Sequence, residues 1–342
     1  MICALCNLEK NPKSNTHYLT DFIIRTALNE EGVNVRSKGL YFNFDQENLF
    51  SEMRFQRETS PQKLEEILGR PATDEEIQIA IDDIEFSVND KFCKDCEDIF
   101  GVIENNFHDN ILNHFRNQEY SNELNLNTFN VDESKIVRLF FLLQFWRTSI
   151  CDDSFSLSDD ISEFLRLKIL NMDYEGLETV PLSVTYLETL PEVDDANIEA
   201  DSYKTGNIVS PVSGSNPYII LLNDFVIQLY DDYTFPYIYF YGLNTRESYL
   251  RFLNFNSLEF ESLVFLDSER KEFLSNLIQP TVLNKIAGCR DFFRLHFQNK
   301  FGELPSEEIE GDFLDRFSKD ENINKLSEES LTKFTKDFLG KL

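Results

Sequence analysis

Two pairs of cysteines with the spacing C-x-x-C constrain this chain more than any other feature. The first pair is Cys3 and Cys6, and the second pair, Cys93 and Cys96, lies far downstream. A C-x-x-C turn places two thiolates on one side of an ion, and a tetrahedral zinc site needs four such ligands. We therefore predict that Cys3, Cys6, Cys93 and Cys96 together bind one structural zinc ion.

The stretch between the two pairs is long for a single zinc module. An insertion on the side away from the metal accounts for its length, because additional loop residues add little to the free energy of loop closure. We expect this insertion at residues 55–85. Two segments there, 59–62 and 73–76, each resemble the start of a helix, and a Gly-Arg-Pro break at 69–71 separates them. We expect two short helices there, either as a loop elaboration or as a hairpin that reaches a partner.

The rest of the chain predicts an α+β protein with a mainly helical body and a small antiparallel sheet. Residues 136–147 are apolar nearly all round, which predicts a central buried helix. Segments rich in β-branched and aromatic residues, separated by turn residues, predict an antiparallel meander. The expected strands cover 180–187, 208–212, 218–222, 225–230 and 237–241. The expected regions are a zinc module over 1–110, a helical region over 111–175, a β-rich region over 176–256 and a helical region over 257–342.

The composition is acidic and rich in phenylalanine. The 32 Phe residues favour a packed interior, and a net charge of −29 opposes non-specific nucleic-acid binding. An acidic surface serves solubility or docking to a basic protein partner. The sequence shows no run of apolar residues long enough for a membrane span and no signal-peptide pattern at its start, so we expect a cytoplasmic protein. There, paired cysteines indicate metal ligands, whereas Cys151 and Cys289 are expected to be core residues or free thiols.

A histidine and a glutamate accompany the cysteine pairs. His17 follows the first pair in a polar stretch, and Glu97 follows the second pair directly. In this pattern the chain resembles the zinc-stabilised branch of the HNH, or ββα-metal, endonucleases. There, a strand ending in a catalytic histidine lies between two C-x-x-C pairs, and the second pair opens a metal-binding helix. The segment 145–149 also resembles the helical region of a group of such bacterial proteins.

The resemblance implies a fold and a set of roles. Residues 1–110 would form a ββα-metal-like module, with His17 as the general base that activates water. Glu97 would hold a catalytic Mg²⁺ or Mn²⁺, distinct from the zinc. Asn89 would be an orienting residue, and Glu104 and His108 would be further candidate ligands. The implied activity is hydrolysis of phosphodiester bonds in DNA or RNA, a reaction that such bacterial proteins often use in defence against phage.

A second hypothesis belongs to a different class of protein. The cysteine module would then be a non-catalytic scaffold, His17 an ordinary hydrogen-bonding group, and the chain an acidic interaction or regulatory subunit of a complex. Arg25, Arg138 and Arg147 are candidate phosphate contacts under the nuclease hypothesis. For Arg138 and Arg147, inside an apolar helix, we expect pairing with a buried carboxylate instead.

Overall fold

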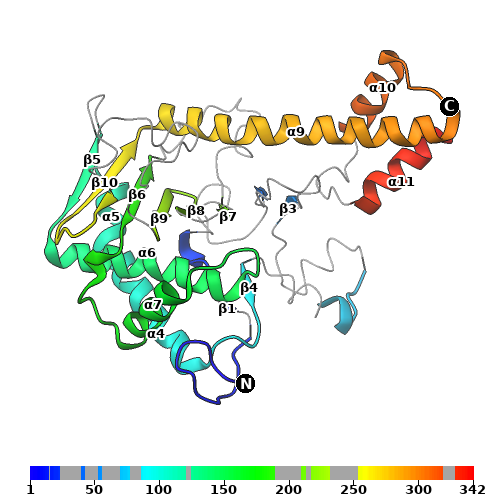
Figure 1. The fold of residues 1–342 in the computed structure, drawn as a ribbon. Coiled ribbons are helices and arrows are strands. Elements are labelled where there is room, and N and C mark those ends of the chain that lie inside the picture. Colours follow the sequence, from blue (N-terminus) through cyan, green and yellow to red (C-terminus); the bar gives the residue numbers. More distant parts are fainter. Residues whose placement is uncertain are drawn as a thin grey trace.

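The computed structural model shows a mixed α+β protein built around one large sheet (Figure 1). No helix in the part of the chain that it describes is long and apolar enough to cross a membrane. The described residues are 1–14, 16–23, 40–42, 53–55, 70–77, 86–120, 125–188, 209–212, 217–231, 253–318 and 328–342.

Two short strand pairs and a run of helices make up the first part of the chain. β1 (Thr16–His17) pairs antiparallel with β4 (Ser87–Val88), and β2 (Leu40–Phe42) pairs with β3 (Met53–Phe55). After β4 come α4 (Lys94–Phe107), a π-helical turn η2 (His108–Leu112) and α5 (Asn113–Arg116). The helix start predicted at 73–76 is confirmed, because the side chains of Thr73 and Glu76 cap each other's backbone N–H groups. The helix expected before it lies outside the described residues.

The helix α6 (Val131–Cys151) is the buried centre of the body, as predicted. It begins at a capping box, in which Asn130 accepts hydrogen bonds from two backbone N–H groups and Glu133 bonds back to Asn130. From Val137 to Thr148 every residue is buried, since α4, α7 (Asp159–Asn171) and the sheet all pack against it.

Six strands form the large sheet, in the order β5-β10-β6-β9-β8-β7. All neighbours run antiparallel except β10 and β6, which are parallel. β8 and β9 form the predicted hairpin, and Asn223 in its turn has a positive φ of 50°. The strands are β5 (Leu126–Phe129), β6 (Leu182–Leu187), β7 (Val209–Val212), β8 (Tyr218–Leu222), β9 (Phe225–Leu229) and β10 (Phe260–Phe265). The short 3₁₀ helix η3 (Leu177–Thr179) precedes β6.

Most strand pairs of this sheet are antiparallel, but the sheet differs in part from the small antiparallel sheet that we predicted. It is larger and mixed, because it recruits β5 and β10 from regions for which we predicted helices. β10 lies between β5 and β6, so its pairing partners are distant in sequence and leave no local signal. The strand expected over 237–241 lies outside the described residues.

Both faces of the sheet are covered. The side chains of Ile220 and Leu222 belong to the main core with α4 and α6, whereas Ile219 and Leu221 face the start of α9. Successive residues of β8 thus point to opposite hydrophobic layers, which explains a strand buried along its whole length. Figure 1 shows α4, α6 and α7 on one side of the sheet and α9 on the other.

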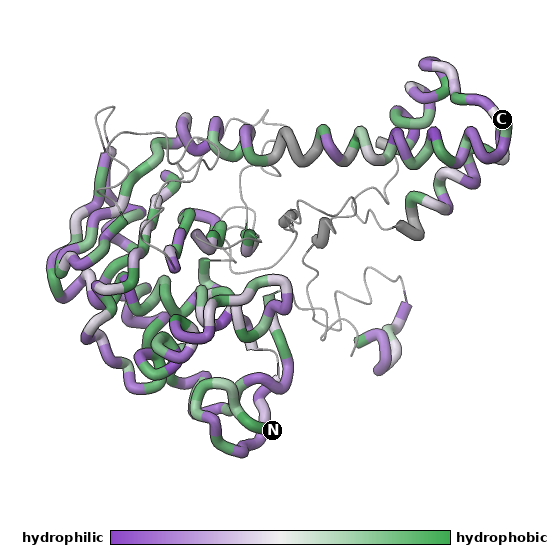
Figure 2. The backbone as a smooth tube through the Cα atoms, in the orientation of Figure 1, coloured by the Kyte–Doolittle hydropathy of each residue, from purple (hydrophilic) through white to green (hydrophobic). Residues whose placement is uncertain are grey.

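The C-terminal helices form a third hydrophobic cluster beyond the sheet. α9 (Asp267–Phe301) extends past the sheet, and its last turns pack against α10 (Glu307–Ser318) and α11 (Glu328–Leu339). Along α10 and α11 hydrophobic and hydrophilic residues alternate (Figure 2). The helices expected in this region lie at 267–301, 307–318 and 328–339.

Candidate metal centre and predicted catalytic residues

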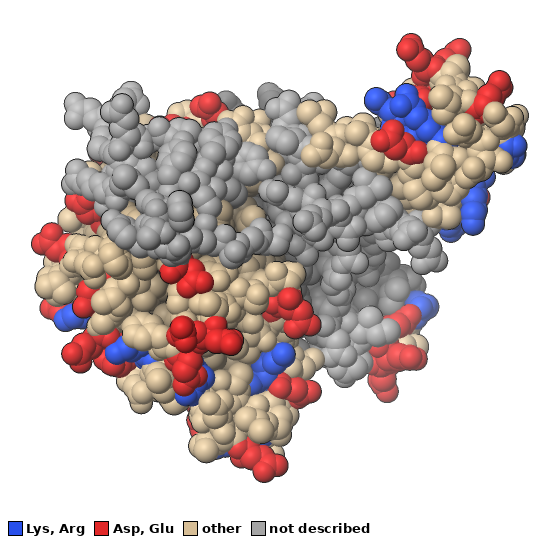
Figure 3. All heavy atoms as spheres, in the orientation of Figure 1, with Lys and Arg blue, Asp and Glu red and all other residues tan. Residues whose placement is uncertain are grey.

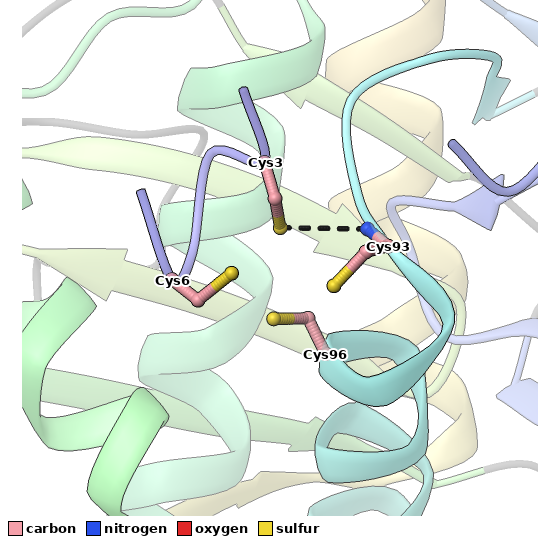
Figure 4. A group of neighbouring side chains, drawn as sticks. All are labelled: Cys3, Cys6, Cys93 and Cys96. Atoms are coloured by element: carbon pink, nitrogen blue, oxygen red, sulfur yellow. Dashed lines mark hydrogen bonds between the residues drawn. The ribbon is translucent and has the colours of Figure 1, made fainter. Parts of the chain in front are cut away.

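The first cysteine pair lies in a tight loop at the N-terminus. The backbone N–H of Asn7 donates to the carbonyl of Cys3 at 2.9 Å, and the N–H of Cys3 donates to the carbonyl of Leu8 at 3.0 Å. Asn7 adopts a positive φ of 57°, a conformation that asparagine tolerates better than most residues. The loop thereby turns the side chains of Cys3 and Cys6 to the same side (Figure 4).

The second pair opens helix α4. Cys93 is the N-cap residue, and its carbonyl accepts the N–H groups of Cys96 and Glu97 at 3.1 Å. The two loops are joined by backbone hydrogen bonds, because the N–H of Ala4 donates to Lys91 at 3.0 Å and the N–H of Lys13 to Phe92 at 2.9 Å. The N-terminal loop is therefore fixed against the start of α4 before any ion is considered.

The four sulfur atoms point toward one another (Figure 4) and all lie within 4.8 Å of one another. A tetrahedral zinc ion with Zn–S bonds of about 2.3 Å holds its sulfurs about 4 Å apart, so four sulfurs within this range could hold a metal ion. Cys3, Cys93 and Cys96 are buried. The prediction that the four cysteines lie together is confirmed.

The protonation of the thiols is consistent with a role as metal ligands. Burial acts to raise the pKa of Cys3, but N–H donors of Cys6, Cys93 and Leu5 outweigh it and lower the pKa to about 7. Burial, and then the neighbouring cysteines, raise the pKa of Cys96 far above its usual range. Four thiolates at such short range would repel one another, so a bound cation would have to compensate their charge for all four thiols to ionise.

His17 lies on β1, opposite Ser87 of β4. Its Nε2 is 3.8 Å from Oδ1 of Asp21, and both side chains are about one quarter exposed, at 22% and 24%. Its carbonyl accepts a hydrogen bond from Arg147 at 3.2 Å. Asp21 was not among the predicted site residues, and its spacing gives no local signal, because His17 lies on a strand and the helical residues begin only at Asp21.

Glu97 lies in the first turn of α4, directly after the last cysteine. Its Oε2 is 3.2 Å from Nζ of Lys13, whereas its Oε1 is buried and has no hydrogen-bond partner among the described residues. An acceptor oxygen left unsatisfied in the interior costs free energy, and such atoms mark places where a cation or water binds.

Glu104, two turns further along α4, is part of a buried network. Its Oε1 accepts hydrogen bonds from Arg147 at 2.5 Å and from the hydroxyl of Thr20 at 2.8 Å. Arg147 also donates to Gln144 and lies over the ring of Phe100 at 5.3 Å. The expectation that Arg147 pairs with a carboxylate is confirmed. The carboxylate belongs to Glu104, which the sequence suggested as a further metal ligand.

The remaining candidates differ in their positions. Asn89 is exposed in the turn between β4 and the second cysteine pair. His108 begins the π-helical turn, is half-exposed and lies 2.8 Å from Asp109. Arg25 lies outside the described residues. Arg138 lies near the other end of α6 and has no carboxylate within ion-pair distance in the part of the chain that the structure describes, so our prediction of a carboxylate partner is wrong there.

Comparison of the chain with models of protein families, with curated proteins and with solved structures finds no match.

Proposed function

We propose that the chain is a zinc-stabilised, metal-dependent HNH-like endonuclease that cleaves DNA or RNA. The observation that carries the proposal is the order of elements around the cysteine cluster. Strand β1 with His17 pairs with β4, and α4 follows with two of the cysteines and Glu97. This order corresponds to the strand–strand–helix arrangement that the resemblance implies.

In this proposal His17 is the general base. It takes a proton from the water that attacks phosphorus, and the bond from phosphorus to the leaving oxygen breaks. The carboxylate of Asp21 lies beside the imidazole, with its Oδ1 3.8 Å from Nε2. Arg147 holds the carbonyl of His17 and fixes the position of β1 relative to α4.

Glu97 is the residue that would hold the catalytic Mg²⁺ or Mn²⁺. Its buried Oε1 without a hydrogen-bond partner among the described residues is a hard oxygen ligand of the kind these ions prefer. The ion would stabilise charge on the phosphate and on the leaving oxygen. Glu104 is a poorer ligand than Glu97, because Arg147 and Thr20 already bind its Oε1.

The test is cleavage of plasmid and of single-stranded DNA and RNA with Mg²⁺ or Mn²⁺. We expect His17→Ala and Glu97→Gln to lose cleavage by at least about a hundredfold while their zinc content stays unchanged. His114→Ala is the matched control, because His114 is half-exposed and lies on α5. Equal cleavage activity in His17→Ala and wild type would contradict the assignment of His17 as the general base.

The second candidate is a non-catalytic, zinc-stabilised interaction subunit. It is favoured by the ion pair that already engages Glu104 and by the net charge of −29. Acidic side chains are spread over the visible face of the body and of the C-terminal helices (Figure 3). Wild-type protein with full zinc content that cleaves none of these substrates supports this candidate against the nuclease.

A further inference from the structure

A cavity of about 410 Å³ opens near the N-terminal end of α6, on a part of the molecule that the cysteine cluster does not use. The first two turns of α6 form one wall, and the segment 173–178 forms the other. Leu258 lies at the rim and is largely exposed. The lining residues of α6 are Val131, Ser134, Lys135 and Arg138, and those of the opposite wall include Asp173, Tyr174, Glu175 and Glu178.

Arg138 supplies a buried positive charge to the inner wall of this cavity. Only 2% of the residue is exposed. Its Nη2 donates to the carbonyl of Ser257 at 2.9 Å and its Nε to the hydroxyl of Ser134 at 3.3 Å. Its guanidinium lies over the ring of Phe260 at 5.1 Å. Its Nη1 is buried and has no hydrogen-bond partner within the described ranges.

The charge of Arg138 is not compensated by a neighbouring carboxylate at short range. Burial lowers its pKa to about 10, and the more distant charge of Glu178 opposes this shift. The side chain is therefore still cationic at neutral pH. Burying a charge without a partner is costly, so an anion in the cavity would gain a strong and poorly screened interaction.

The opposite wall supplies negative charge. Two of the ionised side chains of the cavity are already paired, since Lys135 is 2.8 Å from Asp132 and Asp173 is 2.6 Å from Lys168. Glu178 is half-buried as a residue, and its carboxylate has no hydrogen bond or ion pair among the described residues. The cavity thus has a cation on one wall and a carboxylate on the other, and neither forms an ion pair within the described residues.

We propose that this cavity binds a small zwitterion of the amino-acid class, with its carboxylate toward Arg138 and its ammonium group toward Glu178. Tyr174, Val131 and Leu258 provide apolar contacts for the carbon chain between or beside the two charges. A phosphate dianion fits less well, because Glu175 and Glu178 would repel it. The cavity volume is sufficient for a ligand of this size.

The test is isothermal titration of the full chain with zwitterions of graded length. The probes are the standard L-amino acids and the series glycine, β-alanine, 4-aminobutyrate and 5-aminopentanoate. We expect at least one of them to bind with a Kd below about 1 mM. Its N-acetyl derivative, which keeps only the carboxylate, and its methyl ester, which keeps only the ammonium, should each bind at least about tenfold more weakly.

Variants assign the two charges. Arg138→Gln should abolish binding. Glu178→Gln should weaken binding of the zwitterion at least about tenfold but should not weaken binding of the N-acetyl derivative, because it removes a carboxylate that repels an anion. Glu303→Gln, an exposed carboxylate between α9 and α10, is the matched control and should bind like wild type. Thermal melting checks that each variant is folded. If Arg138→Gln does not fold, the affinity of Glu178→Gln for the zwitterion still tests the proposal. The proposal is overturned if no probe binds at about 10 mM, or if Glu178→Gln binds the zwitterion like wild type.

Discussion

Arg147 joins separate parts of the N-terminal half through one buried guanidinium. It donates to Glu104 on α4, to the hydroxyl of Thr20 and to the carbonyl of His17. Only 3% of its side chain is exposed, whereas 20% of the Glu104 side chain is exposed. A buried cation paired in this way contributes less through attraction than through the cost of removing either partner alone. The network therefore fixes the segment that carries His17 relative to α4.

We predict that Arg147→Met destabilises the protein by about 3–5 kcal/mol, because it leaves the carboxylate of Glu104 partly buried without its partner. Urea unfolding followed by circular dichroism measures this change. Arg316→Met is the matched control, since Arg316 forms an exposed pair with Asp312, and it should change stability by less than about 0.5 kcal/mol. An equal effect in both variants would show that the network is not specially stabilising.

The surroundings of Cys151 change the reactivity of its thiol. Burial raises the pKa of its thiol to about 12, and the charge of Arg147 opposes this only in part. The thiolate is the reactive form, so the raised pKa makes the folded protein resistant to alkylation at this position.

We predict that iodoacetamide at pH 8.5 modifies Cys151 at least about a hundredfold more slowly in the folded protein than in urea. The site-specific rate is measured by mass spectrometry of peptides. Protein unfolded in urea is the reference, because burial no longer raises the pKa there. A folded-state rate close to the rate in urea would contradict the raised pKa.

Helix α4 is the element on which the N-terminal half depends. Its first turn carries Cys96 and Glu97, its second half carries Glu104, and the residue before it is Cys93. Its inner face packs against α6 through Phe100 and Phe107, the latter stacked on Phe140 at 3.8 Å. The resemblance implied a helix that begins at the second cysteine pair, whereas the contact of this helix with Arg147 depends on the packing of α4 on α6.

We predict that the protein binds about one zinc ion per chain and that Cys96→Ser loses it, because three thiolates hold zinc much less tightly than four. A strong chelator should lower the melting temperature of wild type and speed amide exchange in residues 1–14 and 86–93. Metal content is measured by atomic emission. Cys151→Ser is the control and should keep its zinc; an unchanged metal content in Cys96→Ser would refute the four-cysteine site.

At the scale of the whole molecule, the hydrophobic residues form distinct clusters. The main cluster joins α4, α6, α7 and one face of the sheet, and the last turns of α9 form a separate cluster with α10 and α11. In this C-terminal cluster Phe293 is fully buried, and its ring stacks on that of Phe313 with the centroids 4.1 Å apart. Because the two clusters share no residue, we expect them to respond separately to a local defect.

We predict that Phe293→Ala loosens the C-terminal helices by about 3–5 kcal/mol and leaves the sheet intact. Hydrogen exchange should become faster in α10 and α11 but not in β6, β8 and β9. Leu295→Ala, whose side chain is 55% exposed on the same helix, should have little effect. Simultaneous loss of protection in the sheet would mean that the two clusters unfold as one unit.

The sequence by itself determined the features that depend on local spacing. The C-x-x-C pairs predicted the cysteine cluster, the apolar run 136–147 predicted the buried helix α6, and residues 218–230 predicted the hairpin of β8 and β9. In each case the signal lies within a few residues, because a turn, a helix face or a strand pleat repeats over that range. The predicted regions 1–110, 111–175, 176–256 and 257–342 stay predictions.

Only the tertiary structure decided which distant groups meet. β10 joins the sheet between β5 and β6 because the chain returns to it after β9, and no residue of 260–265 encodes its partners. Arg147 forms an ion pair with a carboxylate and Arg138 does not among the described residues, although both lie on the apolar helix α6. Their environments differ because α4 packs against one part of α6, whereas the other part lines a cavity. Residue type sets what a side chain can bind, and the packing of the elements sets which group it reaches.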